Sequence, residues 1–180
     1  HILQFSAPIG PNETAVPFDD CVTAILPERT PAEARPIEIK VKGMHYKDTD
    51  PTYWIVQPEV LRADFASKIH GRFENSDIRH LSVFGLAPIP LLMELGRLLS
   101  DISVADVYEL QREPAQWSWP ENRDEVHFTR HRGAPGPKKV ALKLSITNEV
   151  NDAAVVEVLG QDVSIWEISS DQHRAGIIRH

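Results

Sequence analysis

The sequence predicts an α/β fold, a Rossmann-like and mostly parallel sheet flanked by helices. Residues 81–87 are apolar at nearly every position, which is typical of a strand covered by helices on both faces of a parallel sheet. Pro88 and Pro90 then interrupt the strand, and an apolar pattern with helical spacing follows over 91–102. Strands and helices alternate in this way along the chain, which favours parallel strands joined by right-handed crossovers.

The other elements follow from local patterns. Residues 1–36 are rich in proline, and we interpret them as an irregular lead-in or the end of a preceding module. Ile37 to Val41 alternates apolar and polar residues, and Pro58 is expected to open a helix. The predicted strands are 21–26, 37–41, 81–87, 104–110, 126–130, 140–146 and 163–168, and the predicted helices are 58–72, 91–102 and 153–159. Gly96 is expected to let the helix at 91–102 approach the sheet closely.

Length and composition limit the class of protein. A chain of 180 residues can bury a sizeable core, and it contains no apolar run of about 18 residues that would span a membrane. The one cysteine, Cys21, excludes an intrachain disulfide and fits a reducing cytoplasm. A net charge of −7 argues against binding duplex nucleic acid through its phosphates.

The distribution of charge is more informative than its total. Between Glu125 and Glu149 there is no acidic residue, whereas the stretch holds five lysines and arginines. One basic segment in an acidic protein suits a small anionic ligand, so Arg130 and Lys138 are candidate ligand contacts. The alternative is a solvated loop that carries a few basic side chains.

The turn between the strand at 81–87 and the next helix is a second candidate. Open α/β sheets bind ligands at the carboxyl ends of their strands, and helix N-termini there attract anions. Ala87, Pro88, Ile89 and Pro90 occupy that position, although a well-packed strand and helix without a ligand would show the same pattern. The glycine-rich signatures of dinucleotide and nucleoside triphosphate sites are absent, so no cofactor is expected.

Two further pairs of residues suit a nucleotide ligand. Trp117 and Trp119 could stack on a base, or could cover the edge of a core. Ser145 and Thr147 come at the end of the predicted strand 140–146, where they could donate hydrogen bonds to phosphate or ribose, or act as caps.

Catalytic and metal-binding patterns have little support. His127 and His131 have the spacing of metal ligands on a helix, but their segment is expected to be extended. No Gly-x-Ser-x-Gly elbow occurs. We therefore predict no catalytic residue and no metal ligand.

Several stretches carry a resemblance to a known family. They are HLSVFGLAPIPLLMELGRLLSD at 80–101, the strand 104–110, Arg112-Glu113-Pro114 with Trp117-Ser118-Trp119, and the strands 142–145 and 164–168. Together they resemble the SAVED domain of bacterial anti-phage signalling effectors, over residues 37–168. The resemblance implies a CRISPR-associated Rossmann fold and makes 37–180 a sensor unit.

The resemblance also implies a function and partners. SAVED domains bind cyclic di- or trinucleotides, self-associate, and switch on a fused or associated effector, without being enzymes themselves. They consist of two fused units, and this chain resembles the first, so the sensor unit is expected to be incomplete. Two alternatives stay open. One is a phosphodiesterase-type hydrolase that uses His127, His131 or Glu94, and the other is a protein-interaction module that binds no ligand.

Overall fold

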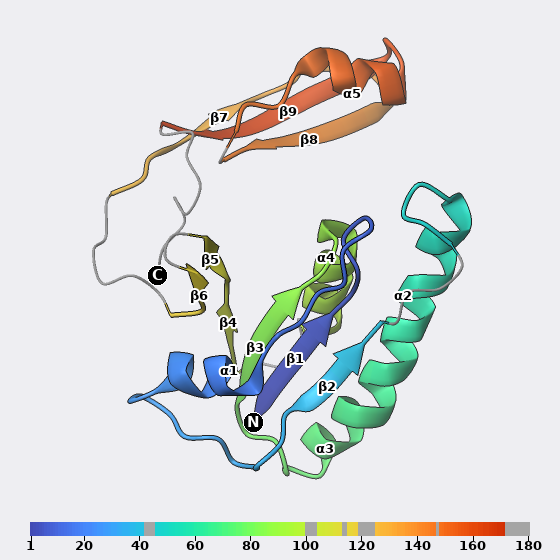
Figure 1. The fold of residues 1–180 in the computed structure, drawn as a ribbon. Coiled ribbons are helices and arrows are strands. Elements are labelled where there is room, and N and C mark those ends of the chain that lie inside the picture. The colour runs from blue at the N-terminus through green and yellow to red at the C-terminus, as the bar shows by residue number, and fades with distance from the viewer. Residues whose placement is uncertain (42–45, 100–103, 113–114, 119–124, 147, 172–180) are drawn as a thin grey trace. The chain divides into compact units, whose positions relative to one another are not determined.

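The structure is a computed structural model that describes residues 1–41, 46–99, 104–112, 115–118, 125–146 and 148–171. Its chain divides into two compact units, unit 1 (His1–Trp119) and unit 2 (Pro120–His180) (Figure 1). Each unit has its own sheet, and each is described by itself below.

Unit 1 is built on a parallel sheet of four strands. In spatial order these are β2 (Ile37–Lys40), β1 (Ile2–Ser6), β3 (Leu81–Leu86) and β4 (Ala105–Tyr108). Helices flank this sheet on both faces, so the predicted α/β fold with a mostly parallel, Rossmann-like sheet is confirmed. Two short antiparallel strands, β5 (Gln111–Arg112) and β6 (Ala115–Gln116), follow β4.

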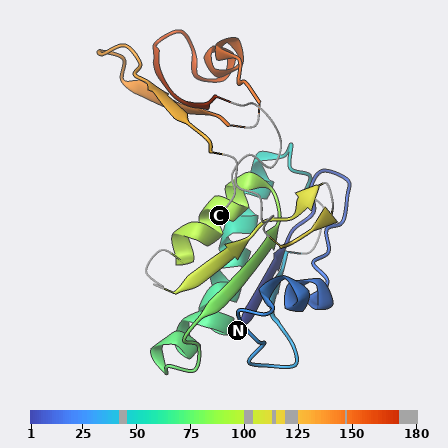
Figure 2. The same cartoon turned by 90° about the vertical axis from the view of Figure 1, so that its left-hand side faces the viewer.

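The helices of unit 1 cover the sheet unequally. One face carries α2 (Pro51–Phe65) and α4 (Ile89–Leu99), with a π-helical turn η1 (Ala66–His70) and α3 (Gly71–Glu74) continuing from α2. The other face carries α1 (Phe18–Ile25) (Figure 2). Alternate residues of the strands therefore belong to two different cores. Leu3, Phe5 and Val83 pack toward α2 and α4, whereas Ile2 and Phe84 pack toward α1.

The predicted strand, turn and helix around Pro88 are confirmed. Strand β3 covers 81–86, and α4 begins at Ile89 with Pro90 in its first turn. The buried side of α4 consists of Leu91, Leu95 and Leu99, one helical turn apart. The periodicity of the leucines therefore determines which face of α4 meets the sheet.

Three expectations for the first 60 residues are wrong. Residues 1–36 contain a fully buried strand, β1, and the expected strand at 21–26 is largely part of the helix α1. In α1, Cys21 and Ile25 lie one turn apart on the buried side. The negative charges of Asp19 and Asp20 in the first turn interact favourably with the positive end of the helix dipole. Helix α2 begins at Pro51 rather than at Pro58, because the Asp50 side chain accepts the Thr52 N–H at 2.8 Å and caps the helix.

Unit 2 is a smaller sheet with one helix. Strands β7 (Phe128–His131), β8 (Lys139–Ser145) and β9 (Val163–Ser170) lie in the order β7-β9-β8, with β8 and β9 parallel and β7 antiparallel to β9. Helix α5 (Asp152–Leu159) connects the two parallel strands, as the sequence predicts. Asn151 caps it by accepting the Ala153 N–H at 2.8 Å. Among the described helices of both units, none is long and apolar enough to cross a membrane.

Candidate functional site

The turn between β3 and α4 lies at the carboxyl edge of the sheet of unit 1. Ala87 is buried, and Ile89 is 67% exposed. The Pro88 carbonyl accepts the amides of Leu91 at 2.9 Å and Leu92 at 3.2 Å, and Pro90 has no amide hydrogen. The turn is thus accessible to a ligand, but it offers an anion few free N–H donors.

The approach of α4 to the sheet depends on Gly85. A Cβ at Gly85 would lie 2.8 Å from Leu92 Cδ2, whereas a Cβ at Gly96 would meet no atom within 4 Å. The expectation for Gly96 is therefore wrong, and the residue at the close contact is Gly85. Its missing side chain lets the first turn of α4 settle on the end of β3.

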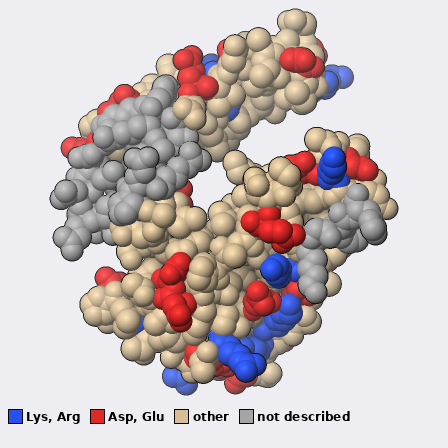
Figure 3. Space-filling model, viewed as in Figure 1, with Lys and Arg blue, Asp and Glu red and all other residues tan. Residues whose placement is uncertain are grey.

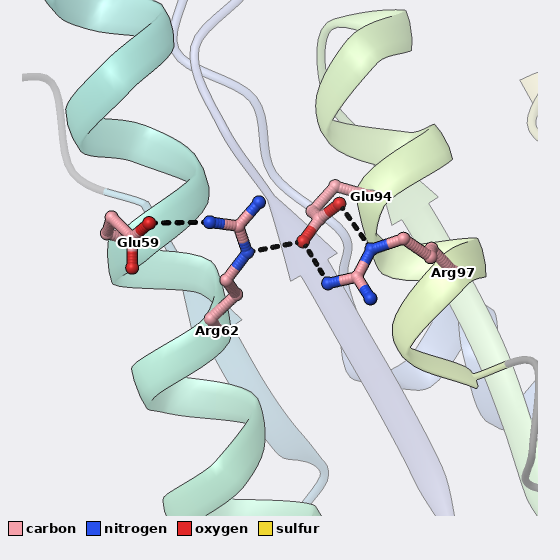
Figure 4. Close-up of polar contacts among 4 residues, drawn as sticks. All are labelled: Glu59, Arg62, Glu94 and Arg97. Atoms are coloured by element: carbon pink, nitrogen blue, oxygen red, sulfur yellow. Dashed lines mark hydrogen bonds and ion pairs between the residues drawn. The ribbon is translucent and has the colours of Figure 1, made fainter.

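Glu94 on α4 is held by arginines from two helices (Figure 4). Its carboxylate accepts Arg62 Nε at 2.6 Å, and it accepts Arg97 Nη2 at 2.7 Å and Nε at 2.9 Å. Hydrogen bonds from Arg97, and then from Arg62, lower the pKa of Glu94 to about 2. A carboxylate of such low basicity is poorly suited to accept a proton at neutral pH, so this geometry argues against the general base of the hydrolase alternative.

Charges of both signs are mixed over this part of the protein. Figure 3 shows acidic and basic side chains interleaved over α2 and the elements beside it, rather than one broad basic surface. Arg62 also pairs with Glu59 at 2.5 Å on its own helix. A long polyanion would find alternating attraction and repulsion on this face.

Trp117 lies in the core of unit 1. Its side chain is 3% exposed, and its ring meets Phe84 edge to face with the centroids 5.4 Å apart. Phe84 in turn stacks on Tyr108 at 4.5 Å. The indole of Trp117 is therefore already buried in packing contacts, which favours the core alternative over base stacking. Trp119 and Thr147, the partners of Trp117 and Ser145 in the sequence hypotheses, lie outside the described residues.

The Ser145 hydroxyl is engaged in hydrogen bonds within unit 2. It is fully buried, its Oγ donates to Glu167 Oε1 at 2.5 Å, and the same Oγ accepts the Val150 N–H at 3.3 Å. The neighbouring Lys143 Nζ lies 2.6 Å from Asp152 Oδ1 and 3.1 Å from Glu167 Oε2. The hydrogen bonds that Lys143 donates to Asp152 and then to Glu167 raise the pKa of Lys143 despite its burial. This network fastens α5 to the sheet and leaves Ser145 no free hydrogen to give a phosphate.

The two basic candidates are exposed but do not converge. Arg130 lies on β7 opposite Ile168, and Ile168 lies opposite Leu144 on β8. Lys138 precedes β8, six residues before Leu144, which corresponds to roughly 20 Å along an extended strand. One phosphate cannot contact both side chains, so each needs a separate test.

The structure gives the histidine pair no metal-binding geometry. His131 belongs to β7 and His127 directly precedes it, so four residues of extended chain separate their side chains by about 13 Å. Within the described ranges, no group of three or more His, Cys, Asp or Glu could hold a metal ion.

A cavity of about 350 Å³ opens at the amino edge of the sheet of unit 1. Beside this cavity, Asp106 Oδ2 accepts a hydrogen bond from Arg29 Nε at 3.0 Å. The same oxygen lies 3.0 Å from His80 Nε2. Burial, followed by the charge of Arg29, lowers the pKa of His80. Sequence reasoning missed this cluster, because Arg29 comes from a proline-rich loop and Asp106 from a distant strand.

Comparison with known proteins identifies a family. The sequence model of the SMODS-associated and fused to various effectors sensor domain, SAVED, matches residues 61–180. The match begins inside α2 and includes the whole of unit 2, so it starts later and ends later than the expected 37–168. No curated protein matches the chain. Because the match covers two thirds of the 180 residues, the chain belongs to the SAVED family of sensor domains.

Proposed function

We propose that this chain is the sensing part of a bacterial anti-phage effector that works in the cytoplasm. It binds a cyclic di- or trinucleotide, and binding promotes self-association and activates a fused or associated effector. The SAVED match over residues 61–180 carries this proposal. The expected incomplete sensor unit, 37–180, is extended in this proposal to include β1 (Ile2–Ser6), because β1 pairs with both β2 and β3 in the same sheet.

The geometry supports a binding role more than a hydrolytic one. Glu94 is neutralised by two arginines, and His127 and His131 lie along an extended segment rather than around one point. A cyclic nucleotide needs an accessible turn, a few basic groups and a stacking surface. The turn at 87–90 and the exposed Arg130 and Lys138 are the described features that could supply the first two.

Calorimetry against a panel of cyclic di- and trinucleotides tests the proposal directly. We expect saturable binding of at least one member, with the ligand recovered unchanged by mass spectrometry afterwards. If no member of the panel binds detectably, the result would favour the alternative of a protein-interaction module that binds no ligand. Cleavage of the ligand by the purified chain would favour the hydrolase.

Reversing the charge of Arg130 or Lys138 tests the basic segment. We expect Arg130→Glu or Lys138→Glu to weaken nucleotide binding at least about tenfold, because each puts a carboxylate where a phosphate would approach. Both side chains are exposed and have no hydrogen bond or ion pair within the part of the chain that the structure describes, so the fold should be unaffected. Arg35→Glu, an exposed position in unit 1, is the matched control for the change in net charge. Wild-type affinity in both variants would remove the basic segment from the site.

An acidic residue at the turn tests the carboxyl edge. We expect Ile89→Glu to weaken nucleotide binding by about tenfold, since the added carboxylate would repel phosphate at the first turn of α4. Met93→Glu is the control, because Met93 lies one turn further along the same helix and is similarly exposed, at 62%. Calorimetric affinities that are equal for the two variants would show that the turn is not where phosphate binds.

A further inference from the structure

Strand β8 leaves one edge of the unit 2 sheet open. It pairs only with β9 among the described residues, so the outer edge of its seven residues has no strand beside it. On one side of β8, every second residue is a large apolar side chain that faces solvent, Val140, Leu142 and Leu144, with Leu142 63% exposed. A long apolar edge strand is a ready template for pairing with another strand.

The lysines of β8 do not protect this edge from pairing with another strand. Lys139 and Lys143 lie on the opposite side of the strand, under α5. Lys139 Nζ donates to the Leu159 carbonyl at 2.7 Å, and Lys143 Nζ is paired with Asp152 and Glu167. Charged side chains normally protect an edge strand by pointing outward, and here both are tied to the helix and its network.

Among its described residues, unit 2 also buries no apolar side chain. Its described residues that are buried are all polar or charged: Lys143, Ser145, Ser164 and Ser170. Side-chain burial is the main source of folding free energy, and a small sheet that leaves its apolar side chains in water gains little of it. A further strand on the open edge of β8 would place its own side chains beside Val140, Leu142 and Leu144 and remove part of their apolar area from water.

We propose that a second copy of this chain pairs with β8, edge to edge and antiparallel, about a two-fold axis at Leu142. With the apolar sides of both sheets facing the same way, such an axis must lie midway between one residue of β8 and the same residue of the second copy. At Leu142 it sets Val140 against Leu144 of the second copy, Lys139 against Ser145 and Lys143 against Ala141. Every cross-strand pair is then either apolar or of one lysine with a small uncharged residue.

The neighbouring registers are disfavoured by charge. An axis at Ala141 sets Lys139 against Lys143 of the second copy, and an axis at Lys143 sets that lysine against its own copy. Like charges directly opposite destabilise a strand pair, so only the axis at Leu142 combines long overlap with no repulsion. The strand is self-complementary in this one register.

This pairing would provide the surface for the self-association in the proposed function. Only its biological role rests on that proposal. Sedimentation of the full chain over a range of concentrations should show a saturable dimer. Leu142→Lys sets two lysines against each other and should weaken that dimer about a hundredfold. Val158→Lys on α5, where Val158 is 82% exposed, is the control and should leave the dimer unchanged. If Leu142→Lys fails to fold, Val140→Lys tests the same edge.

The register has its own test. Leu142→Lys and Leu142→Glu should each be monomeric alone and should form a mixed dimer when combined, because the two charges then lie opposite each other. A wild type that stays monomeric, a dimer indifferent to Leu142→Lys, or a mixture without a dimer each overturns the inference. Calorimetry on the same samples separates the two proposals: nucleotide binding without a dimer overturns this inference alone, and a dimer without nucleotide binding overturns the proposed function alone.

Discussion

Leu95→Asp is expected to unfold unit 1. Leu95 is buried in the centre of the α4 face, where it packs with Leu91, Leu99 and the side chains of the sheet. An aspartate there loses the apolar contacts and must either keep an unpaired charge in the core or take up a proton. We expect a loss of about 4 kcal/mol or more, which is a large part of the 5–15 kcal/mol that usually holds a domain folded.

Urea unfolding followed by circular dichroism measures this effect. Met93→Asp is the matched control, because it places the same charge two residues away on the exposed side of α4. Its stability should stay within about 0.5 kcal/mol of wild type. A Leu95→Asp variant that unfolds cooperatively at the wild-type urea midpoint would contradict the packing described for α4.

The contrast between α4 and the first 60 residues shows what sequence patterns can predict. The strand β3 and the helix α4 have long apolar patterns with an unmistakable proline break, and both were predicted within three residues at every boundary. Strand β1 has only five residues before the first of several prolines, so its pattern is too short to distinguish from a loop. The start of α2 depends on one hydrogen bond, from Thr52 to Asp50, which an apolar pattern does not reveal.

The candidate site was harder to predict than the fold, for a related reason. Burial and partners decide what a polar or aromatic side chain can do, and both depend on residues far away in the chain. Trp117 is engaged by Phe84, and Ser145 by Glu167 across the sheet. In the same way, Glu94 is neutralised in part by Arg62, which belongs to another helix. Residue type and spacing identified these positions as polar or aromatic, but they could not identify the partners.

Glu94→Gln is expected to loosen the connection between α2 and α4. The substitution keeps the shape of the side chain but removes the charge that holds Arg62 and Arg97. Hydrogen bonds between charged groups contribute more than neutral ones, and partly exposed pairs contribute less than buried ones. We expect a loss of about 1–2 kcal/mol at neutral pH, measured by urea unfolding. Glu59→Gln is the control, because Glu59 is more exposed and, within the described part of the chain, is paired with Arg62 alone, and it should change stability by less than about 0.5 kcal/mol.

The same variant has a distinct dependence on pH. The pKa of Glu94 is about 2 in the folded protein, against an ordinary value of 4.5. A carboxyl with a lowered pKa stabilises the fold fully above its unfolded value, and this stabilisation is lost as the pH falls through the folded value. The stability difference between wild type and Glu94→Gln should therefore be constant above about pH 5 and should shrink from there toward pH 2. A difference that stays constant across this range would mean that the two arginines do not hold Glu94 in its charged form.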